Sequence, residues 1–428
     1  MVYFSMLFII ICFALVPFKK KKYHFFMPSF IVLITNLIPY VLGFIYYDSQ
    51  SLINRDFDCD LLFSFVLMFV GVSYYISYNF YLKKPLFFLD NIVYEIKRFP
   101  TIYYILLIIL YCVSFLYLLN STGLNPIDNS LMFRVRSSHD YGVIYAAYAN
   151  IPMVILLISV YWFLEEKRKI HLFFIMASII SMMFSGSRGM IILGGLGFVF
   201  IYKTTRHKDV SKKIKIASFI LLMVISIVYP IYRITGNIDI DMMLMIMDDI
   251  SWDNKDLLEP LFRSDALKNL YVLIEALDNN IIEYKYGESW IDAMLMLIPR
   301  GLYENKPLFF DNEIHKFFSD EFAYGVGSLD FNSDYFMGEA FANFYLLGPI
   351  VYGWVWGWFI CQVDKIYKIA LKNKNMILSI SLFYLPIMFS LNIPEMGFNG
   401  MAFQQFLIIF VFSMMQKKII KWSFKNEK

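Results

Sequence analysis

The sequence predicts an all-α polytopic membrane protein with about 11 transmembrane helices, and three observations support this. Of the 428 residues, 59% are hydrophobic and only 17% are charged, whereas an average soluble domain is about 45–50% apolar and about 25% charged. Long apolar runs recur along the chain, and the basic residues concentrate in alternate gaps between them. The composition excludes a soluble globular protein, a disordered chain and a disulfide-rich secreted module.

Each apolar run predicts one membrane-spanning helix. A span needs about 20 apolar residues to cross a hydrocarbon layer roughly 30 Å thick, and a helix satisfies every backbone group in lipid. The basic cluster Lys19–Lys22 follows the first run instead of preceding it, which predicts an uncleaved helix and not a signal peptide. The runs cover residues 2–18, 25–47, 61–82, 101–119, 142–164, 170–186, 189–204, 214–232, 341–361, 376–393 and 399–416.

The charges between the runs predict the orientation of the chain. Cytoplasmic loops of membrane proteins are enriched in Lys and Arg. If residues 19–22 are cytoplasmic and the spans alternate, 26 of the 38 basic residues fall in cytoplasmic segments. The short outer loops carry only Arg55, Arg134, Arg136 and Arg188. We therefore expect a multi-pass protein of the plasma membrane with its N-terminus outside and its C-terminus in the cytoplasm.

One long outer segment divides the chain into three regions. Residues 1–232 are predicted to form an N-terminal bundle of about 8 spans, and residues 341–428 a bundle of about 3 spans with a basic cytoplasmic tail. Between them, residues 233–340 form a large extracytoplasmic loop with 8 basic and 21 acidic residues.

This loop contains helical patterns of its own. Apolar residues at helical spacing after Ser264-Asp265 predict one helix, with Leu267, Leu270, Ile274 and Leu277 on one face. A second helix is predicted from Trp290 to Ile298, before a proline. We expect a folded cap, because structureless loops of this length are unusual. A solvated acidic linker is the alternative.

The first candidate for chemistry is Arg188, in the turn Ser185–Gly189 between two short spans. Placing a charged side chain within the membrane costs about 2.5 kcal/mol or more in free energy unless water or an anion contacts the charge. A guanidinium beside free backbone N–H groups forms a good binding site for phosphate. The alternative is a tight turn whose arginine reaches lipid headgroups.

Two other basic pairs lie on the predicted outer side. Arg134 and Arg136 could clamp a pyrophosphate or contact headgroups. Arg300 and Lys306 flank a glycine-containing turn held between two prolines, in an otherwise acidic loop. The alternative for this second pair is an ordinary surface turn.

Carboxylates precede the span at 341–361. Asp334 lies upstream, and Glu339 and Asn343 share one helical face because they are four residues apart. A carboxylate partly removed from water there could have a raised pKa and act as a general base. The alternative is a carboxylate stabilised by the helix macrodipole.

Two further patterns have weaker implications. The alternating acids Asp56, Asp58 and Asp60 resemble a divalent-metal motif, but nucleotide sugars are absent outside the cell, so we expect no metal. Glycines among tryptophans predict helix packing and interfacial anchoring; they are Gly353, Gly357, Trp354, Trp356 and Trp358. The sequence has no Walker A, GxGxxG or GxSxG motif, so a nucleotide-driven pump, a dinucleotide enzyme and an α/β-hydrolase have no support.

These residues carry a family resemblance. The chain resembles the Wzy-type oligosaccharide repeat-unit polymerases of the O-antigen and capsular polysaccharide pathways. The resemblance covers most of the chain as architecture. It departs from related ligases, which commonly have a histidine where this chain has Glu339, and from relatives drawn with an even number of spans. The matching motifs are Ser185–Gly189, Ile298–Arg300 with Lys306-Pro307, Arg263–Asp265, and Gly338–Phe344 leading to Gly348.

The resemblance implies a GT-C-like fold and a membrane glycosyltransferase without a cofactor, metal or nucleic-acid partner. Its substrate would be an undecaprenyl-pyrophosphate-linked oligosaccharide at the outer face of the bacterial plasma (inner) membrane. Membrane lipids, a chain-length regulator and a flippase would be its partners. Arg188 would act in catalysis and on the pyrophosphate; the other pyrophosphate-binding residues would be Arg263, Arg300, Lys306, Arg134 and Arg136. The general base would be Glu339, with Asp334, His139 and His315 as reserves.

Three alternatives remain open. An O-antigen ligase would share the fold, the lipid-linked donor and the use of arginines to bind its pyrophosphate. A flippase or transporter of the same lipid-linked oligosaccharide would also be helical, although it does not need a cap of about 108 residues. A structural scaffold of an assembly complex would not require the basic turns.

Overall fold

The computed structural model describes residues 1–18, 27–33, 37–49, 53, 55–84, 105, 108–116, 142–184, 201–202, 266–295 and 337–372. Every regular element within these ranges is a helix, so the all-α class is confirmed for them. The chain divides into two compact units, which are described separately. Unit 1 comprises Met1–Tyr94, Leu258–Asn373 and Ser381–Lys428, and unit 2 comprises Glu95–Leu257 and Lys374–Ile380.

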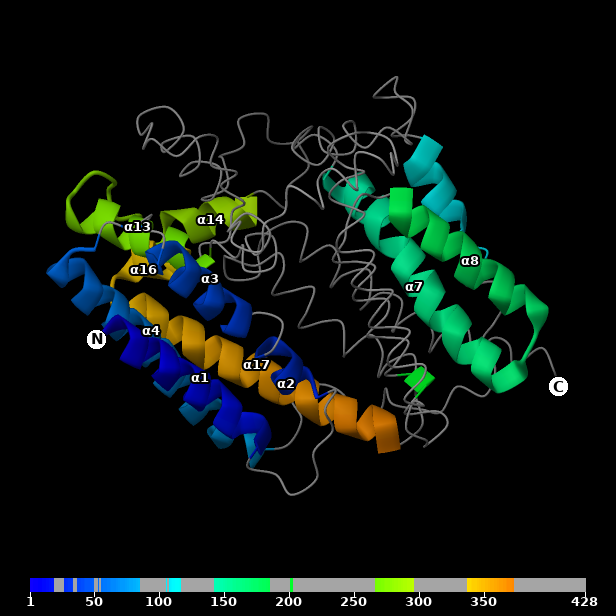
Figure 1. Ribbon diagram of the computed structural model, residues 1–428, viewed down its shortest axis with the longest axis horizontal. Helices are drawn as coiled ribbons and strands as arrows, with labels where there is room; N and C mark the ends of the chain where they lie inside the picture. The colour runs from blue at the N-terminus through cyan, green and yellow to red at the C-terminus, as the bar shows by residue number, and fades with distance from the viewer. Residues whose placement is uncertain are drawn as a thin grey trace, which may run out of the picture. The chain divides into compact units, whose positions relative to one another are not determined.

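Unit 1 contains parts of all three regions of the sequence. In Figure 1 its long helices lie side by side, and α13 and α14 lie across the end at which α4 and α17 begin. Its helices are α1 (Val2–Phe18), α2 (Pro28–Val32), α3 (Ile38–Ser49), α4 (Phe57–Leu82), α13 (Ala266–Asp278), α14 (Glu288–Leu295), α16 (Gly338–Phe344) and α17 (Leu347–Lys372).

Several helices coincide with the predicted spans. The runs at 2–18 and 61–82 are α1 and α4, whereas the run at 25–47 contains two helices, α2 and α3. Of the described helices, α4 is the one long and apolar enough to cross a membrane by length and composition, and shorter apolar stretches lie at Val2–Val16, Ile155–Glu165 and Lys169–Ile179. The predicted spans at 214–232, 376–393 and 399–416, and nearly all of 189–204, lie outside the described residues.

Helices α4 and α17 pack closely because two glycines of α17 face α4. A Cβ atom on Gly353 would lie 2.1 Å from Ser73 Oγ, and one on Gly357 would lie 2.4 Å from the carbonyl oxygen of Tyr74. The Ser77 hydroxyl donates a hydrogen bond of 2.6 Å to a backbone oxygen of α17. The predicted role of these glycines in helix packing is confirmed.

Helices α1, α4 and α17 run in the same direction. The rings of Phe13 and Tyr74 stack with centroids 3.8 Å apart, while Tyr3, at the start of α1, lies beside Arg55 at the start of α4. Gly353 of α17 meets α4 near Ser73, and Asp364, later in α17, meets Tyr78, which is also later in α4. All three helices therefore begin at the same end of unit 1, which is the end covered by α13.

Polar contacts fix the opposite end of unit 1. Asp364, which is 1% exposed, accepts hydrogen bonds from the Tyr78 hydroxyl at 2.6 Å and from the Ser29 backbone N–H at 3.1 Å. Lys365 Nζ donates to the carbonyl oxygens of Tyr81 and, at 2.7 Å, Lys84. A single turn of α17 thus holds both α2 and the last turn of α4.

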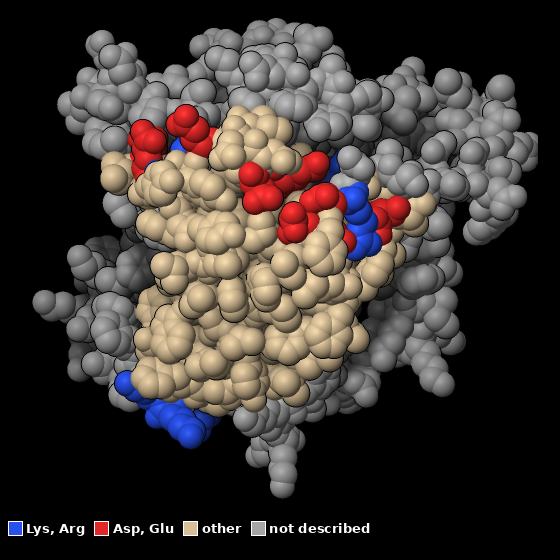
Figure 2. Space-filling view, turned by 90° about the vertical axis from the view of Figure 1, so that its left-hand side faces the viewer, with Lys and Arg blue, Asp and Glu red and all other residues tan. Residues whose placement is uncertain are grey.

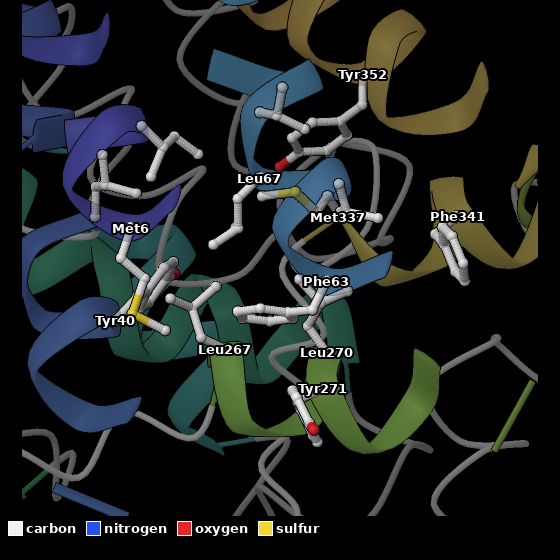
Figure 3. Close-up of a cluster of buried hydrophobic side chains, with 14 of the residues drawn as sticks. Met6, Tyr40, Phe63, Leu67, Leu267, Leu270, Tyr271, Met337, Phe341 and Tyr352 are labelled. Atoms are coloured by element: carbon white, nitrogen blue, oxygen red, sulfur yellow. The ribbon is translucent and has the colours of Figure 1, made fainter. Parts of the chain in front are cut away.

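The helix predicted after Ser264-Asp265 is α13, and its predicted apolar face is confirmed. Its buried ring, Tyr271, packs against Phe63 of α4 with centroids 5.4 Å apart; both residues are labelled in Figure 3. The same ring lies 5.9 Å from that of Phe44 of α3. Each such side chain, when fully buried, contributes about 1.5–3 kcal/mol, so α13 is held by packing. The apolar residues of that face are almost completely buried: Leu267, Leu270, Ile274 and Leu277.

The second predicted cap helix is present over part of its range. Helix α14 begins at Glu288, two residues before the predicted start, and is described as far as Leu295. The remainder of the prediction, residues 296–298, lies outside the described residues.

Unit 2 contains a helical hairpin of α7 (Gly142–Glu166) and α8 (Lys169–Phe184), which lie side by side in Figure 1. They agree with the predicted spans at 142–164 and 170–186. The two helices are joined through Lys167, which has a φ of 55° and whose N–H closes the last turn of α7 on Phe163 at 3.0 Å.

Charged side chains lie at the two ends of the face drawn in Figure 2. The acidic side chains visible there lie towards one end, where some basic ones accompany them, other basic side chains lie at the opposite end, and a band without charged side chains separates the two. Within unit 1, α1 exposes an apolar stripe at helical spacing; it consists of Phe4, Leu7, Ile11 and Leu15. Large exposed apolar surfaces mark contact with a membrane or another protein.

Candidate functional site

Of the candidate site residues, the structure describes Glu339. The remaining ones lie outside the described residues, so their predicted roles stay predictions; they are Arg134, Arg136, Arg188, Arg263, Arg300, Lys306 and Asp334, together with the reserves His139 and His315. The described site is therefore the surroundings of Glu339.

Glu339 lies in the first turn of α16 beneath the cap helix α14. Its side chain is 5% exposed. The hydroxyl of Ser289, in α14, donates a hydrogen bond of 2.6 Å to Glu339 Oε1. A carboxylate removed from water requires such donors, because an unpaired buried charge is very costly. Ser289 is equally buried, so this contact joins two helices inside the protein.

Asn343, one turn later on α16, completes the arrangement. Its Nδ2 donates to Ser289 Oγ at 2.7 Å and to the carbonyl oxygen of Glu339 at 2.8 Å. Its Oδ1 accepts a bond of 2.8 Å from the backbone N–H of Gly287. We call Glu339, Asn343, Ser289 and Gly287 the Glu339 network. The predicted common face of Glu339 and Asn343 is confirmed, and both side chains point to the cap.

The backbone around α16 explains how so short a helix is held. Met337 before it and Tyr345 after it have φ angles of 57° and 49°, so the chain turns sharply at both ends. A Cβ atom on Gly348 would lie 1.7 Å from the carbonyl oxygen of Ala340. Only glycine allows α17 to start this close to α16.

The Glu339 network is a directed chain of hydrogen bonds. The amide of Asn343 donates to the Ser289 hydroxyl, and that hydroxyl donates to the Glu339 carboxylate. A carboxylate that already accepts from one hydroxyl is oriented to accept a proton from another, which is the action of a general base. The first-turn position of Glu339 also suits the alternative role of a carboxylate at a helix N-terminus.

A second polar cluster, which was not predicted from the sequence, lies at the same end of unit 1. Arg55 forms ion pairs with Asp60 at 2.6 Å and with Asp48 at 3.2 Å. The Tyr271 hydroxyl, from α13, donates to Asp60 Oδ1 at 2.9 Å. The hydrogen bond to Asp60 and the charges of Asp60 and Asp48 raise the pKa of Arg55. This Arg55 cluster joins α3, α4 and the cap.

The acidic trio belongs partly to this cluster. Asp56 is the N-cap of α4, and its Oδ2 accepts from the backbone N–H groups of Asp58 at 3.1 Å and Cys59 at 3.4 Å. Asp60 is paired with Arg55. In the described parts of the chain, no group of three or more His, Cys, Asp or Glu side chains could hold a metal ion.

The sequence contained no signal for the Arg55 cluster because its members are joined by tertiary contacts. Arg55 and Asp60 are five residues apart, which is not a spacing that brings side chains together on a helix. Asp48 belongs to another helix, and Tyr271 follows more than 200 residues later.

Comparisons with known proteins add no relationship to these observations. No protein-family model, no curated protein and no solved structure matches the chain.

Proposed function

We propose that the protein is a multi-pass membrane glycosyltransferase of the bacterial plasma membrane. It joins undecaprenyl-pyrophosphate-linked oligosaccharide repeat units into O-antigen or capsular polysaccharide at the outer face of that membrane. The observation that carries the proposal is the Glu339 network: an oriented carboxylate beneath a folded cap, at the head of an apolar helix bundle.

The charge distribution and dimensions of unit 1 support the membrane location. At about 1.5 Å per residue, the 26 residues of α4 extend about 39 Å, which exceeds a hydrocarbon layer of about 30 Å. Lys365 and Lys84 lie at the end of unit 1 opposite the cap, consistent with a cytoplasmic location under the positive-inside rule. The exposed apolar stripe of α1 suits lipid contact.

The reaction needs few chemical groups. An acceptor hydroxyl oxygen of one repeat unit forms a bond to the anomeric carbon of the other, and the bond from that carbon to the pyrophosphate oxygen breaks. The hydroxyl proton passes to a base, which we assign to Glu339. Undecaprenyl pyrophosphate leaves with the bonding electrons, and the charge that develops on it is stabilised by arginine side chains. Arg188, Arg263 and Arg300 are the proposed donors, assisted by Lys306 and Arg134 or Arg136.

The size distribution of the surface polysaccharide in a strain lacking this gene tests the function. We expect a single repeat unit at the surface and no longer chains, because units are made, moved across the membrane and attached but not joined. A full-length polymer retained on undecaprenyl pyrophosphate would indicate a ligase instead. Single lipid-linked units retained inside the cell would indicate a flippase. Either result would contradict the polymerase proposal.

The role of Glu339 is tested by Glu339→Gln. Glutamine keeps an oxygen that can accept from Ser289, so the cap stays bound, but it cannot take up the acceptor proton. We expect long chains to disappear while the amount of folded protein in the membrane is unchanged. The matched control is Asp58→Asn, which likewise turns a carboxylate into an amide, on an exposed residue at the start of α4; this variant should polymerise normally. Normal chain length in Glu339→Gln would leave Glu339 with the structural role alone.

A further inference from the structure

Three tyrosines gather beside the Glu339 network at the edge of the buried core, against which Tyr284 packs. The ring of Tyr284 lies 5.9 Å from that of Tyr345 and 6.3 Å from that of Tyr286. Tyr286 is 82% exposed and Tyr345 is 43% exposed. We call these three residues the tyrosine cluster. It lies at the junction of the loop before α14 with the end of α16.

The backbone holds the cluster in a fixed arrangement. The N–H groups on either side of Tyr286 are both bonded to α16: that of Lys285 to the carbonyl oxygen of Ala342 at 2.9 Å, and that of Gly287 to Asn343 Oδ1 at 2.8 Å. Tyr286 itself has a φ of 48°, a region that bulky side chains rarely occupy. A large ring is thus presented to solvent from a rigid loop, which lowers the entropy lost when a ligand binds.

In residues 278–288, the segment that carries Tyr284 and Tyr286, three carboxylates outnumber one lysine, Lys285. Asp278, Glu283 and Glu288 are exposed residues of the same cap segment. Burial, and to a smaller extent the charges of Tyr345 and Asp278, raise the pKa of Tyr284 to about 12, and its hydroxyl, like that of any tyrosine, is a hydrogen-bond donor at physiological pH. The surface therefore offers aromatic faces, hydroxyl donors and carboxylate acceptors, with an excess of negative charge.

This combination selects among ligands. The negative charge disfavours phosphates and anionic lipid headgroups. A neutral sugar ring suits it, because the apolar face of the ring covers an aromatic side chain while its hydroxyl groups donate to carboxylates. The backbone N–H of Gly287, the residue after Tyr286, donates to Asn343, which belongs to the Glu339 network. A sugar bound here would lie beside the proposed general base.

We propose that the tyrosine cluster is a binding platform for a neutral sugar of the oligosaccharide on which the protein acts. This inference rests on the proposed function and deepens it, because it assigns a sugar subsite to residues of the cap. Tyr286 is the main stacking residue, and Tyr284 and Tyr345 support its position and extend the surface.

Binding of the free repeat unit to the full-length protein tests the platform. The probe is the oligosaccharide released by mild acid from its lipid carrier, and the protein is held in lipid nanodiscs. Tyr286→Asn removes the ring but tolerates the positive φ, so folding is preserved. We expect about tenfold weaker binding by calorimetry, which corresponds to about 1.4 kcal/mol. Tyr286→Phe keeps the ring and should bind nearly as well as the original protein.

Phe57→Ala is the matched control, because it removes another strongly exposed ring of unit 1 that lies outside the cluster; it should leave binding unchanged. Unchanged affinity in Tyr286→Asn, or no binding by the original protein, would overturn the platform. Tyr286→Cys, made in a variant whose four native cysteines are replaced by serine, should react with a membrane-impermeant maleimide. Failure to react would show that the position does not face water and would likewise overturn the platform.

These outcomes separate the platform from the proposed function. If deletion of the gene removes long chains but Tyr286→Asn binds the oligosaccharide normally, the platform alone is wrong. If deletion leaves the polysaccharide ladder intact, the proposed function is wrong whatever the cluster binds.

Discussion

Replacing Asn343 by alanine should loosen the cap from α16 and leave the rest of unit 1 folded. The side chain makes two bonds that cross to the segment carrying α14, one to Ser289 Oγ at 2.7 Å and one from the Gly287 N–H at 2.8 Å. Each intramolecular hydrogen bond contributes about 0.5–1.5 kcal/mol, and a buried partner left unsatisfied costs about 1–3 kcal/mol. The expected loss is about 2–4 kcal/mol in the free energy that closes α14 on α16.

Amide hydrogen exchange measures this closing directly. Because each 1.4 kcal/mol is a factor of ten, exchange of the amides from Gly287 through α14 should accelerate by about 1.5 to 3 orders of magnitude, whereas amides of α4 should not change. Asn79→Ala is the control, because the Asn79 amide donates to the carbonyl oxygen of Tyr75 within its own helix at 2.7 Å. Equal exchange in α14 with and without Asn343 would refute the view that the Glu339 network fastens the cap.

Three other substitutions test the remaining features by thermal unfolding of the detergent-solubilised protein. Gly357→Ala should destabilise α4–α17 packing by about 1–3 kcal/mol, whereas Gly71→Ala, whose Cβ would meet its nearest atoms at 3.4 Å, should have little effect; equal melting would contradict the close approach. Tyr78→Phe removes a donor from buried Asp364 and should cost about 1–3 kcal/mol; an unchanged Tm would show that this bond contributes nothing. Burial, and then a nearby aspartate, raise the pKa of Glu275, so the folded state holds its proton more tightly than the unfolded state and loses stability as pH rises through both values. Glu275→Gln should therefore raise the Tm at pH 7, with the gain disappearing below about pH 4; a gain that persists in acid would contradict this explanation.

Elements with a strong local pattern were predictable from the sequence. The face of α13 could be identified because its leucines recur at helical spacing, and each of them is buried. The first predicted span coincides with α1 because one uninterrupted apolar run forms it. The run at 25–47 contains two helices, α2 and α3, and hydropathy alone does not divide one apolar run into separate helices.

The candidate site was predictable only where two residues lie on one helix. Glu339 and Asn343 are four apart, so their common face followed from helical geometry. Their partner Ser289 lies 50 residues before Glu339, and nothing in an isolated serine indicates that it faces a carboxylate. The tyrosine cluster depends on φ angles that its sequence does not suggest, because tyrosine is an unusual choice at positive φ.

The pairing of α4 with α17 has a consequence for the order of events during synthesis. Tyr78 and Asp364 are 286 residues apart, and ribosomes add roughly 5–20 residues per second. About 15 to 60 seconds therefore separate the two helices at the ribosome. During this interval the face of α4 that receives the glycines of α17 has no partner, and the residues of unit 2 are made in the meantime. The nascent chain must keep that face from other partners until α17, in the final fifth of the chain, emerges, which makes this interval the natural point for a folding factor to act.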